Sequence, residues 1–528
     1  MFKCKQLLRR ICVVSYVFLL CGGLVNASNL VSKTNTLIGT QGNGWASGYL
    51  YPGATYPFGM VQFTPTYFTK QLGFVINQLS GAGCDHMGNF PTLPIAGALR
   101  VSPDSILNMQ TPVGKEIGTA GYYAATVDHS IRAELTVTER TGMARYTFSS
   151  KEKQGTVIIG GGVAATPIQV AAIKITGPHS CEGYAEGGAF CGIPTPYKVY
   201  FVAEFDADAE SFGTWKEERL HANHTFAEGS HSGVYFTFPL KEGNQAVQYK
   251  IGVSYVSVEN ARENLRVENP AWDFSAVRQA TQDKWNEYLG KIEVEGDNED
   301  RQMQFYTHLY RSLIHPNVCS DVNGEYMGAD SQVHKTARKF YTSFSNWDTY
   351  RTQTALIAML APEETSDIVM SHYLFAEQSG GGFPRWVLAN IETGVMQGDP
   401  TPILVANAYA FGARTYDPRT LLRTMRYGAE VPGANSQGVL TRPGLEQYLE
   451  KGYYDASILL EYTSSDFAIG RFALQACNDE PVCNWYTQRA MNWKNLFNKE
   501  TGWLQSRNED GSWKRYDADW WESTYKNY

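Results

Sequence analysis

The sequence has 528 residues and a formal net charge of −8, and 43% of its residues are hydrophobic, 13% aromatic and 19% charged. This length exceeds a single hydrophobic core and predicts two or more domains, and the apolar fraction excludes a disordered chain. The acidic balance argues against a nucleic-acid partner, which would need a basic surface.

The first 27 residues predict a secretory signal peptide. Four basic residues precede an apolar run over residues 11–25, and Ala27 supplies the small residue of a cleavage site. The run is short and is interrupted by Gly22 and Gly23, which disfavours a membrane span; a signal anchor is the alternative. No later segment reaches spanning length. We therefore expect an exported protein (periplasmic, cell-surface or secreted) without a transmembrane segment.

Six cysteines remain once the signal is removed. An exported compartment permits disulfides. Cys181–Cys191 and Cys477–Cys483 are close enough in sequence to pair, although spacing alone does not establish either bond. For the other two cysteines, Cys84 and Cys319, the simplest interpretation is a free and buried thiol. No Cys-x-x-Cys or Cys/His cluster occurs in the sequence, which argues against a structural zinc site.

The hydrophobic period changes near the middle of the chain. Segments such as YKVYFVAEF and AVQYKIGVSYVSV, within residues 30–267, are β-branched and aromatic and are bounded by turn residues, which is typical of strands. Several strands at this spacing favour a β-sandwich. From about Asp273, apolar residues recur every three to four positions, which indicates helices. We expect a β-sandwich domain at 28–268, followed by a helical domain at 269–528.

The helical patterns are joined by loops rich in glycine and proline, such as SGGGFPRW and MQGDPTP. Paired antiparallel helices with aromatics and carboxylates on their loops fit an (α/α)6 toroid barrel, whose site lies on the loops at one end. Helices are predicted at 273–292, 300–316, 347–360, 363–378, 403–413, 456–475 and 485–498.

Two loops of the helical half hold the densest polar and aromatic clusters. SFSNWDTYRTQ places Trp347, Asp348 and Arg351 at the start of a helix, where Asp348 is a candidate acceptor for substrate hydroxyls and Trp347 a candidate pocket wall. The alternative is that Asp348 caps the helix and pairs with Arg351. In GGGFPRW, the glycines and Pro384 keep Trp386 out of helical geometry, and loop packing is the alternative.

The C-terminal segment YDADWWESTYKNY offers a candidate general acid. Glu522 lies beside Trp520 and Trp521, and a carboxyl group against indoles is desolvated, which raises its pKa. A proton donor for glycosidic cleavage needs that property. The alternative is a surface acid on an aromatic helix.

A glycine-rich loop, SGAGCDHMGNFPTLP, adds Asp85 and His86 as candidate substrate contacts. A lone histidine is more often a structural residue whose hydrogen bonds are satisfied.

Several of these segments together resemble glycoside hydrolase family 92, the calcium-dependent exo-α-mannosidases. PGATYPFGMVQ and NWDTYR are the most specific matches, and LSGAGCDHMGNFPTLP, LYRSLIHPNVCSD, GGGFPRWVL and GWLQSRNEDGSW keep the family's order. The resemblance implies a β-sandwich packed on an (α/α)6 barrel. It also implies inverting hydrolysis of a terminal α-mannoside, with a mannose-containing glycan as the partner and a calcium ion that binds sugar hydroxyls.

The resemblance assigns roles to single residues. Asp348 corresponds to a sugar-binding carboxylate and Glu522 to the general acid, although ESTYKNY keeps only the Glu and the final Tyr of the family's acid motif. Asp399, a further candidate substrate contact, stands where the barrel loop of the family usually carries His. The metal ligands are not identified in this sequence.

The resemblance also places the general base and the main calcium ligands in a segment that follows the acid, beyond Tyr528. We therefore expect an incomplete toroid and a chain that is inactive alone. The alternatives are a catalytically inactive glycan-binding protein and another sandwich-plus-toroid carbohydrate enzyme, such as a disaccharide phosphorylase or a glucoamylase-like hydrolase.

Overall fold

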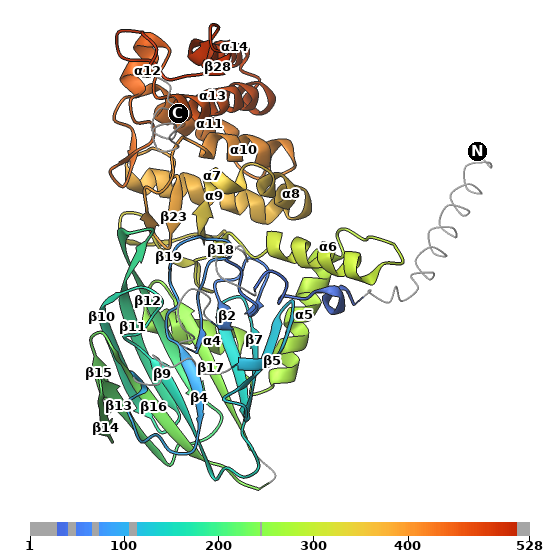
Figure 1. The fold of residues 1–528 in the computed structure, drawn as a ribbon, viewed down its shortest axis with the longest axis vertical. Coiled ribbons are helices and arrows are strands. Elements are labelled where there is room, and N and C mark those ends of the chain that lie inside the picture. Colours follow the sequence, from blue (N-terminus) through green and yellow to red (C-terminus); the bar gives the residue numbers. More distant parts are fainter. Residues whose placement is uncertain (1–28, 41–48, 66–72, 105–112, 243–244, 515–528) are drawn as a thin grey trace, which may run out of the picture.

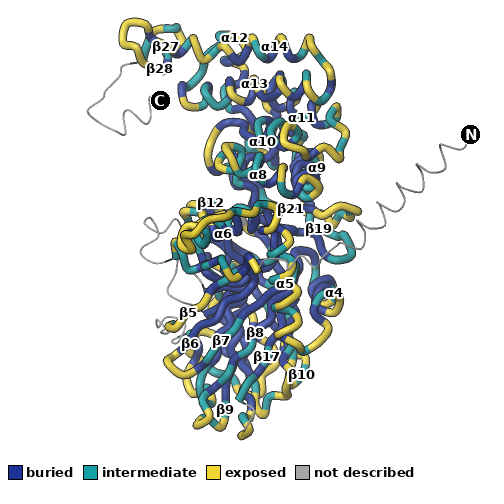
Figure 2. Tube along the Cα trace, turned by 90° about the vertical axis from the view of Figure 1, so that its right-hand side faces the viewer, coloured by how far each residue is buried: buried dark blue, intermediate teal, exposed yellow. Residues whose placement is uncertain are grey.

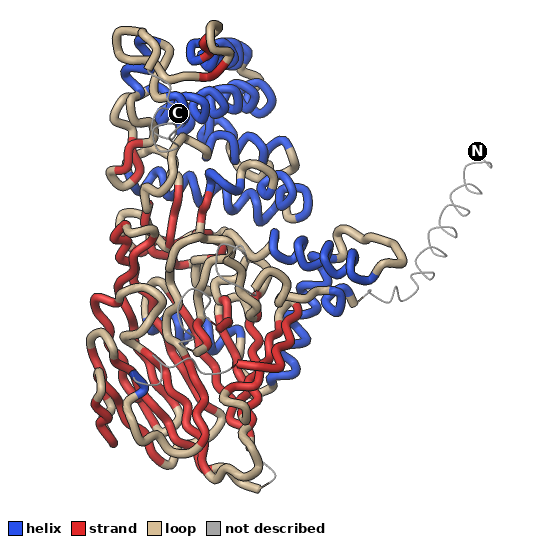
Figure 3. Tube along the Cα trace, viewed as in Figure 1, coloured by secondary structure: helices blue, strands red, loops and turns tan. Residues whose placement is uncertain are grey.

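The computed structural model describes residues 29–40, 49–65, 73–104, 113–242 and 245–514. These residues form a β part and a helical part that are stacked along the long axis of the molecule (Figure 1). Strands fill the lower part and helices dominate the upper part when the chain is coloured by secondary structure (Figure 3).

The β part is a sandwich of two antiparallel sheets, one of eight strands and one of nine. The eight-stranded sheet has the order β1 (Ala54–Thr55), β2 (Gln62–Pro65), β3 (Phe74–Val75), β4 (Thr92–Ala96), β9 (Gln154–Gly160), β16 (Ser232–Pro239), β13 (Ser211–Lys216), β14 (Arg219–Ala222). The nine-stranded sheet has the order β15 (Phe226–Glu228), β10 (Ile168–Gly177), β11 (Ser180–Phe190), β12 (Ile193–Phe205), β17 (Ala246–Ser254), β8 (Thr141–Thr147), β7 (Ile131–Val137), β6 (Tyr122–Val127), β5 (Val113–Thr119).

The core of the sandwich lies between the two sheets. Along β11 buried and partly exposed residues alternate, as expected for a strand with one face on a core. Aromatic side chains of both sheets meet there, and the ring centroids of Phe205 and Phe236 are 5.0 Å apart. The buried stretches run along the strands in Figure 2. Much of the aromatic content of the first half therefore packs as sandwich core.

Three helices join the sandwich to the helical part. α4 (Val258–Glu268) and α5 (Phe274–Leu289) pack on the nine-stranded sheet, and α6 (Glu299–Ser312) contacts the short 3-10 helix at Leu30–Lys33. The prediction of strands up to Val267 is wrong for residues 258–268. There the hydroxyl of Ser257 accepts the backbone N–H of Asn260 at 3.1 Å and caps α4.

The helical part consists of paired helices. α8 packs on α9, α10 packs on α13, and α13 also contacts α11 and α14. The helices are α7 (Asn346–Thr349), α8 (Gln353–Leu360), α9 (Pro362–Ser379), α10 (Thr401–Ala410), α11 (Pro418–Glu430), α12 (Leu445–Lys451), α13 (Ala456–Cys477), α14 (Glu480–Ala490) and the 3-10 helix Met491–Leu496.

Short strand pairs lie in the connections of the helical part. They are β18 (Asn317–Val318) with β21 (Tyr341–Thr342), β19 (Glu325–Met327) with β20 (Val333–Lys335), β22 (Phe344–Ser345) with β23 (Trp386–Leu388) and β24 (Ile391–Glu392), β25 (Asn435–Ser436) with β26 (Val439–Leu440), and β27 (Phe497–Asn498) with β28 (Trp503–Leu504).

The predicted fold class, a β-sandwich followed by paired helices of the toroid type, is confirmed. Some details of the helical part differ. The pattern at 347–360 is two helices, α7 and α8, with a break after Thr349. The sequence did not predict α12 or α11, the second of which begins at Pro418 after Asp417 has capped it. No helix of the described ranges is long and apolar enough to cross a membrane, and the predicted signal peptide lies outside them.

Candidate functional site

A cavity of about 640 Å³ lies where the β-sandwich meets the helical part. The sandwich contributes residues 79–84 and the turn between β11 and β12. The other wall comes from the segment after α6, the turn from β22 into α7, the start of α8, and β23. The volume is within the range of small-ligand sites, and such sites favour the boundary between two structural units.

Asp348 and Trp386 meet at this cavity because two short strands pair. Ser345, at the end of β22, lies directly opposite Trp386 of β23. The chain enters α7 immediately after Ser345, and the Ser345 hydroxyl donates a hydrogen bond to Asp348 Oδ2. Asp348 is exposed and lies within α7, where its carboxylate lines the cavity instead of capping the helix.

Trp386 forms the aromatic part of the wall. Its ring centroid lies 4.3 Å from that of Phe190, at the tip of β11. The neighbouring Arg385 is buried, and its guanidinium donates to the carbonyls of Met396 at 2.9 Å and Gly398 at 3.1 Å. Arg385 thereby holds the segment that brings Val395 and Met396 to the cavity.

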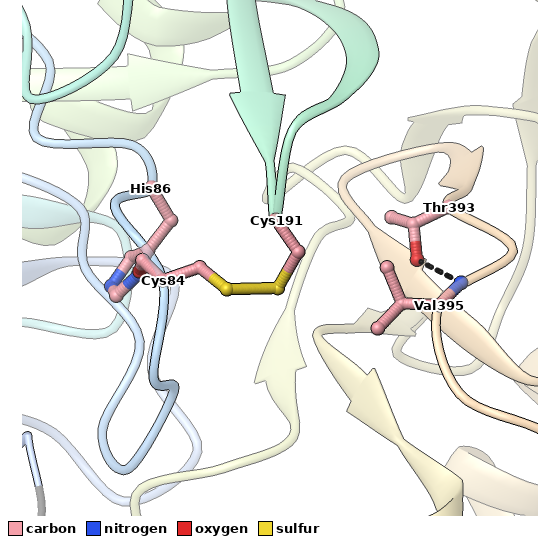
Figure 4. The surroundings of a disulfide bond; sticks show 5 residues. All are labelled: Cys84, His86, Cys191, Thr393 and Val395. Carbon is pink, nitrogen blue, oxygen red and sulfur yellow. Dashed lines mark hydrogen bonds between the residues drawn. A yellow bond between two sulfur atoms is a disulfide. The ribbon is translucent and has the colours of Figure 1, made fainter. Parts of the chain in front are cut away.

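A disulfide between Cys84 and Cys191 joins the two sandwich segments of the wall, and Val395 lies across from it (Figure 4). The local pair Cys181–Cys191 is not formed, because Cys191 is bonded to Cys84, which was expected to be free. The local pair Cys477–Cys483 is not formed either. The other cysteines of the pairs are free and buried.

Two histidines hold the loop at 79–84. The backbone N–H of Leu79 donates to His86 Nε2 at 2.8 Å, and that of Ser80 donates to His315 Nε2 at 2.8 Å. Burial lowers the pKa of each imidazole to about 4, so both rings are neutral near pH 7 and keep the accepting nitrogen. His86 thus supports the loop from behind the cavity lining, whereas His315 lines the cavity itself.

Trp347 of α7 and Arg351, two residues beyond the end of α7, lie near Glu461 of α13. The Arg351 guanidinium lies 5.3 Å from the Trp347 ring centroid, and its Nη2 is 3.5 Å from Glu461 Oε1. Arg351 therefore pairs with Glu461 and not with Asp348. Glu461 was not among the predicted site residues, although a glutamate within the apolar run ASILLEY was a usable signal.

A second unpredicted contact holds the beginning of α7. Asn346 is buried, its Nδ2 donates to Thr401 Oγ1 at 2.8 Å, and its Oδ1 lies 3.0 Å from His372 Nε2. His372 is itself buried and stacks on Phe344, with 3.7 Å between ring centroids.

The remaining predicted residues lie elsewhere. Asp399 is buried beside the cavity segment, where Arg442 Nε donates to its Oδ2 at 2.8 Å, and burial raises the pKa of this carboxyl group. Asp85 is exposed, and neither carboxylate lines the cavity. Glu522 lies outside the described residues.

The described residues do not make up a calcium site by themselves. Within them, no three or more His, Cys, Asp and Glu side chains are grouped to hold a metal ion. The described part of the cavity wall supplies one carboxylate, that of Asp348, whereas calcium takes about six to eight oxygen ligands. A complete calcium shell is therefore not formed by these residues alone.

The chain matches two family models. Residues 34–254 match the glycosyl hydrolase family 92 N-terminal domain, and residues 260–528 match the family 92 catalytic domain.

Solved structures share the fold. A family GH92 α-mannosidase from Bacteroides thetaiotaomicron, BT3965, superposes with a TM-score of 0.84 at 24% identity, over 93% of this chain and 69% of that one. An inverting mannosidase of the same organism, BT2199, gives a TM-score of 0.83 at 25% identity, over 93% and 68%.

A curated relative, named an uncharacterized secreted glycosidase of Arthroderma benhamiae, is 25% identical over 92% of this chain. The chain spans 66% of that relative's length.

The chain is a β-sandwich joined to paired helices, with a carboxylate and an aromatic side chain at the cavity between them, and this architecture is shared with solved structures of family GH92. The chain belongs to glycosyl hydrolase family 92, as the two family models together establish.

Proposed function

We propose that this glycosidase removes terminal α-linked mannose from glycans and inverts the configuration at the sugar carbon. The observation that carries the proposal is the Asp348 carboxylate, oriented by Ser345 in the cavity whose other wall holds Trp386. Support comes from the names of the similar structures, which are mannosidases and include an inverting one.

The cavity offers the two kinds of contact that a sugar needs. A carboxylate accepts charge-assisted hydrogen bonds from sugar hydroxyls, which are roughly twice as strong as neutral ones. Ring surfaces such as those of Trp386 and Phe190 offer an apolar surface to the C–H face of the sugar. The neutral histidines and the disulfide hold the facing loop, so the wall is formed before the ligand arrives.

Inverting hydrolysis requires a proton donor for the leaving oxygen and a second carboxylate that activates water, about 6.5–9.5 Å away. We assign the proton donor to Glu522 from the resemblance of its segment to the family's acid motif. Asp348 is assigned to sugar binding. Calcium dependence also rests on the resemblance and is tested by chelation.

Export is part of the same proposal. It is supported by the predicted signal at residues 1–27 and by the name of the curated relative, a secreted glycosidase.

Binding and hydrolysis should be measured separately, because the chain spans about two thirds of the length of its relatives. Binding is measured by calorimetry with mannoimidazole, the ligand of one similar structure. Hydrolysis is measured on α-1,2, α-1,3, α-1,4 and α-1,6 mannobiose, with and without a chelator.

Mannose release that a chelator abolishes supports the proposal. Binding without hydrolysis would show that this chain holds a mannose-type ligand but does not cleave mannosides, which is the result expected if the chain is inactive alone. Turnover of α-glucosides in place of α-mannosides would indicate a different enzyme of the same class.

A further inference from the structure

The carboxylate of Glu461, on α13, lies close to the segment of α7 that carries Asp348. Glu461 is in the second turn of α13, and its side chain is 20% exposed. It is absent from the cavity lining, yet it contacts two segments next to that lining, one that follows Asp348 and one that follows Met396.

The first contact of Glu461 is with the two residues that directly follow α7. Arg351 Nη2 lies 3.5 Å from Glu461 Oε1, and the Tyr350 hydroxyl donates to Glu461 Oε2 at 3.5 Å. Burial raises the pKa of Glu461, and the charge of Arg351 and hydrogen bonds from Tyr350 and Trp347 only partly offset this rise. Three side chains that flank Asp348 in sequence therefore converge on one carboxyl group.

The second contact is with the segment that carries Met396 to the cavity. Gly398 has φ +84°, and a Cβ built at this glycine would lie 2.7 Å from the Glu461 Cβ. The backbone at Gly398 therefore packs directly on the Glu461 side chain, and only glycine fits there.

The orientation of α7 depends on contacts with the rest of the protein, because the helix is too short to be stable by itself. It has four residues and no side-chain hydrogen bond at its N-cap, so it has too few internal bonds to be stable alone. Asn346 holds its beginning, and Glu461 holds the residues on either side of Asp348.

We infer that Glu461 is a positioning residue of the sugar site, which orients α7 so that the Asp348 carboxylate faces the cavity. The inference rests on the proposed function for the identity of the ligand, and on the contacts above for the positioning.

The test compares Glu461→Ala and Glu461→Gln with a matched control. Glu430 of α11 has the same kind of surroundings: Arg426 Nε lies 2.7 Å from its Oε1, and the Tyr486 hydroxyl donates to the same atom at 2.8 Å. It does not line the cavity. Glu430→Gln thus removes an equivalent charge away from the site.

Mannoimidazole affinity is measured by calorimetry. Glu461→Ala should weaken binding about tenfold or more, because small displacements of a positioned group are costly. Glu461→Gln should be intermediate, since its amide oxygen still accepts from Tyr350, and Glu430→Gln should bind like the wild type. Affinity of both Glu461 variants within twofold of the wild type would overturn the inference, as would an equal loss in Glu430→Gln.

A second readout does not depend on ligand binding. In protein labelled with 5-fluorotryptophan, the ¹⁹F resonance that Trp347→Phe removes identifies Trp347. This resonance should shift in Glu461→Gln and stay unchanged in Glu430→Gln. An unmoved resonance would overturn the positioning role. If the wild type binds no mannose-type ligand while the resonance does shift, the proposed function fails and the positioning role stands.

Discussion

The rings of Phe190 and Trp386, with centroids 4.3 Å apart, connect the β-sandwich to the helical part at the wall of the cavity. Phe190 ends β11 and is followed by Cys191 of the disulfide, while Trp386 begins β23 opposite Ser345. A single aromatic contact thus joins the disulfide-held loops to the turn that carries Asp348. The shape of the site depends on both parts of the chain.

Removing the Phe190 ring should destabilise the protein and weaken ligand binding together. Phe190 is buried, so Phe190→Ala should lower the free energy of unfolding by about 3 kcal/mol through lost packing and a residual cavity. Urea unfolding followed by circular dichroism measures this loss. Phe226→Ala, at a side chain that is 53% exposed, is the control and should change stability little.

Removing the charge of Asp348 should affect binding and leave stability intact. Asp348→Asn keeps the shape but loses charge-assisted hydrogen bonds, and mannoimidazole affinity should fall roughly 10- to 100-fold. Because Asp348 is exposed, the melting temperature of the Asp348→Asn variant should match that of the wild type within error. Undiminished affinity, measured by calorimetry, would show that Asp348 does not bind the sugar.

Removing the disulfide should lower both the stability of the protein and its affinity for the ligand. Replacing Cys84 and Cys191 with serine opens a loop of 107 residues, which should cost about 4 kcal/mol of stability and should also weaken ligand binding. Thiol titration checks the pairing: in the native protein the buried cysteines 181, 319, 477 and 483 should react only after denaturation. Fast reaction of Cys84 under native, non-reducing conditions would contradict the bond.

Acid should destabilise the protein through its buried histidines. The pKa of His315 is about 4 in the folded protein, below its usual value near 6.5, so protonation favours the unfolded chain. The stabilisation is complete above pH 6.5 and is lost as the pH falls toward 4, with a change of roughly 3 kcal/mol.

His315→Gln keeps an acceptor for the Ser80 N–H but does not titrate. Its free energy of unfolding, measured by urea denaturation from pH 7 to 4, should fall less steeply than that of the wild type. Parallel curves for the two proteins would contradict the assignment.

The architecture could be predicted from the sequence, because the strand pattern and the helical spacing of apolar residues are both local features. The β-branched and aromatic residues of segments such as β17, and apolar residues at helical spacing in α5 and α13, are visible without tertiary information. Asp348 and Trp386 were also singled out from the sequence, because each lies in a dense polar and aromatic segment, and the structure brings both to one cavity. α4 was missed because its cap, Ser257, follows a strand without a glycine or proline break.

Contacts between residues that are far apart in the chain could not be predicted from the sequence. Cys191 bonds to Cys84 across 107 positions, whereas spacing favoured a nearer partner. Glu461 contacts Tyr350 across 111 positions, and His315 accepts from Ser80 across 235. Such contacts depend on how sheets and helices stack, which a local pattern does not encode.

The most direct test of the account is a crystal structure of this chain with mannoimidazole. We predict one molecule in the cavity between sandwich and helices, with a sugar hydroxyl within hydrogen-bond distance of the Asp348 carboxylate and the sugar ring near Trp386. A ligand bound elsewhere, or an empty cavity at saturating concentration, would contradict the assignment of this cavity as the sugar site.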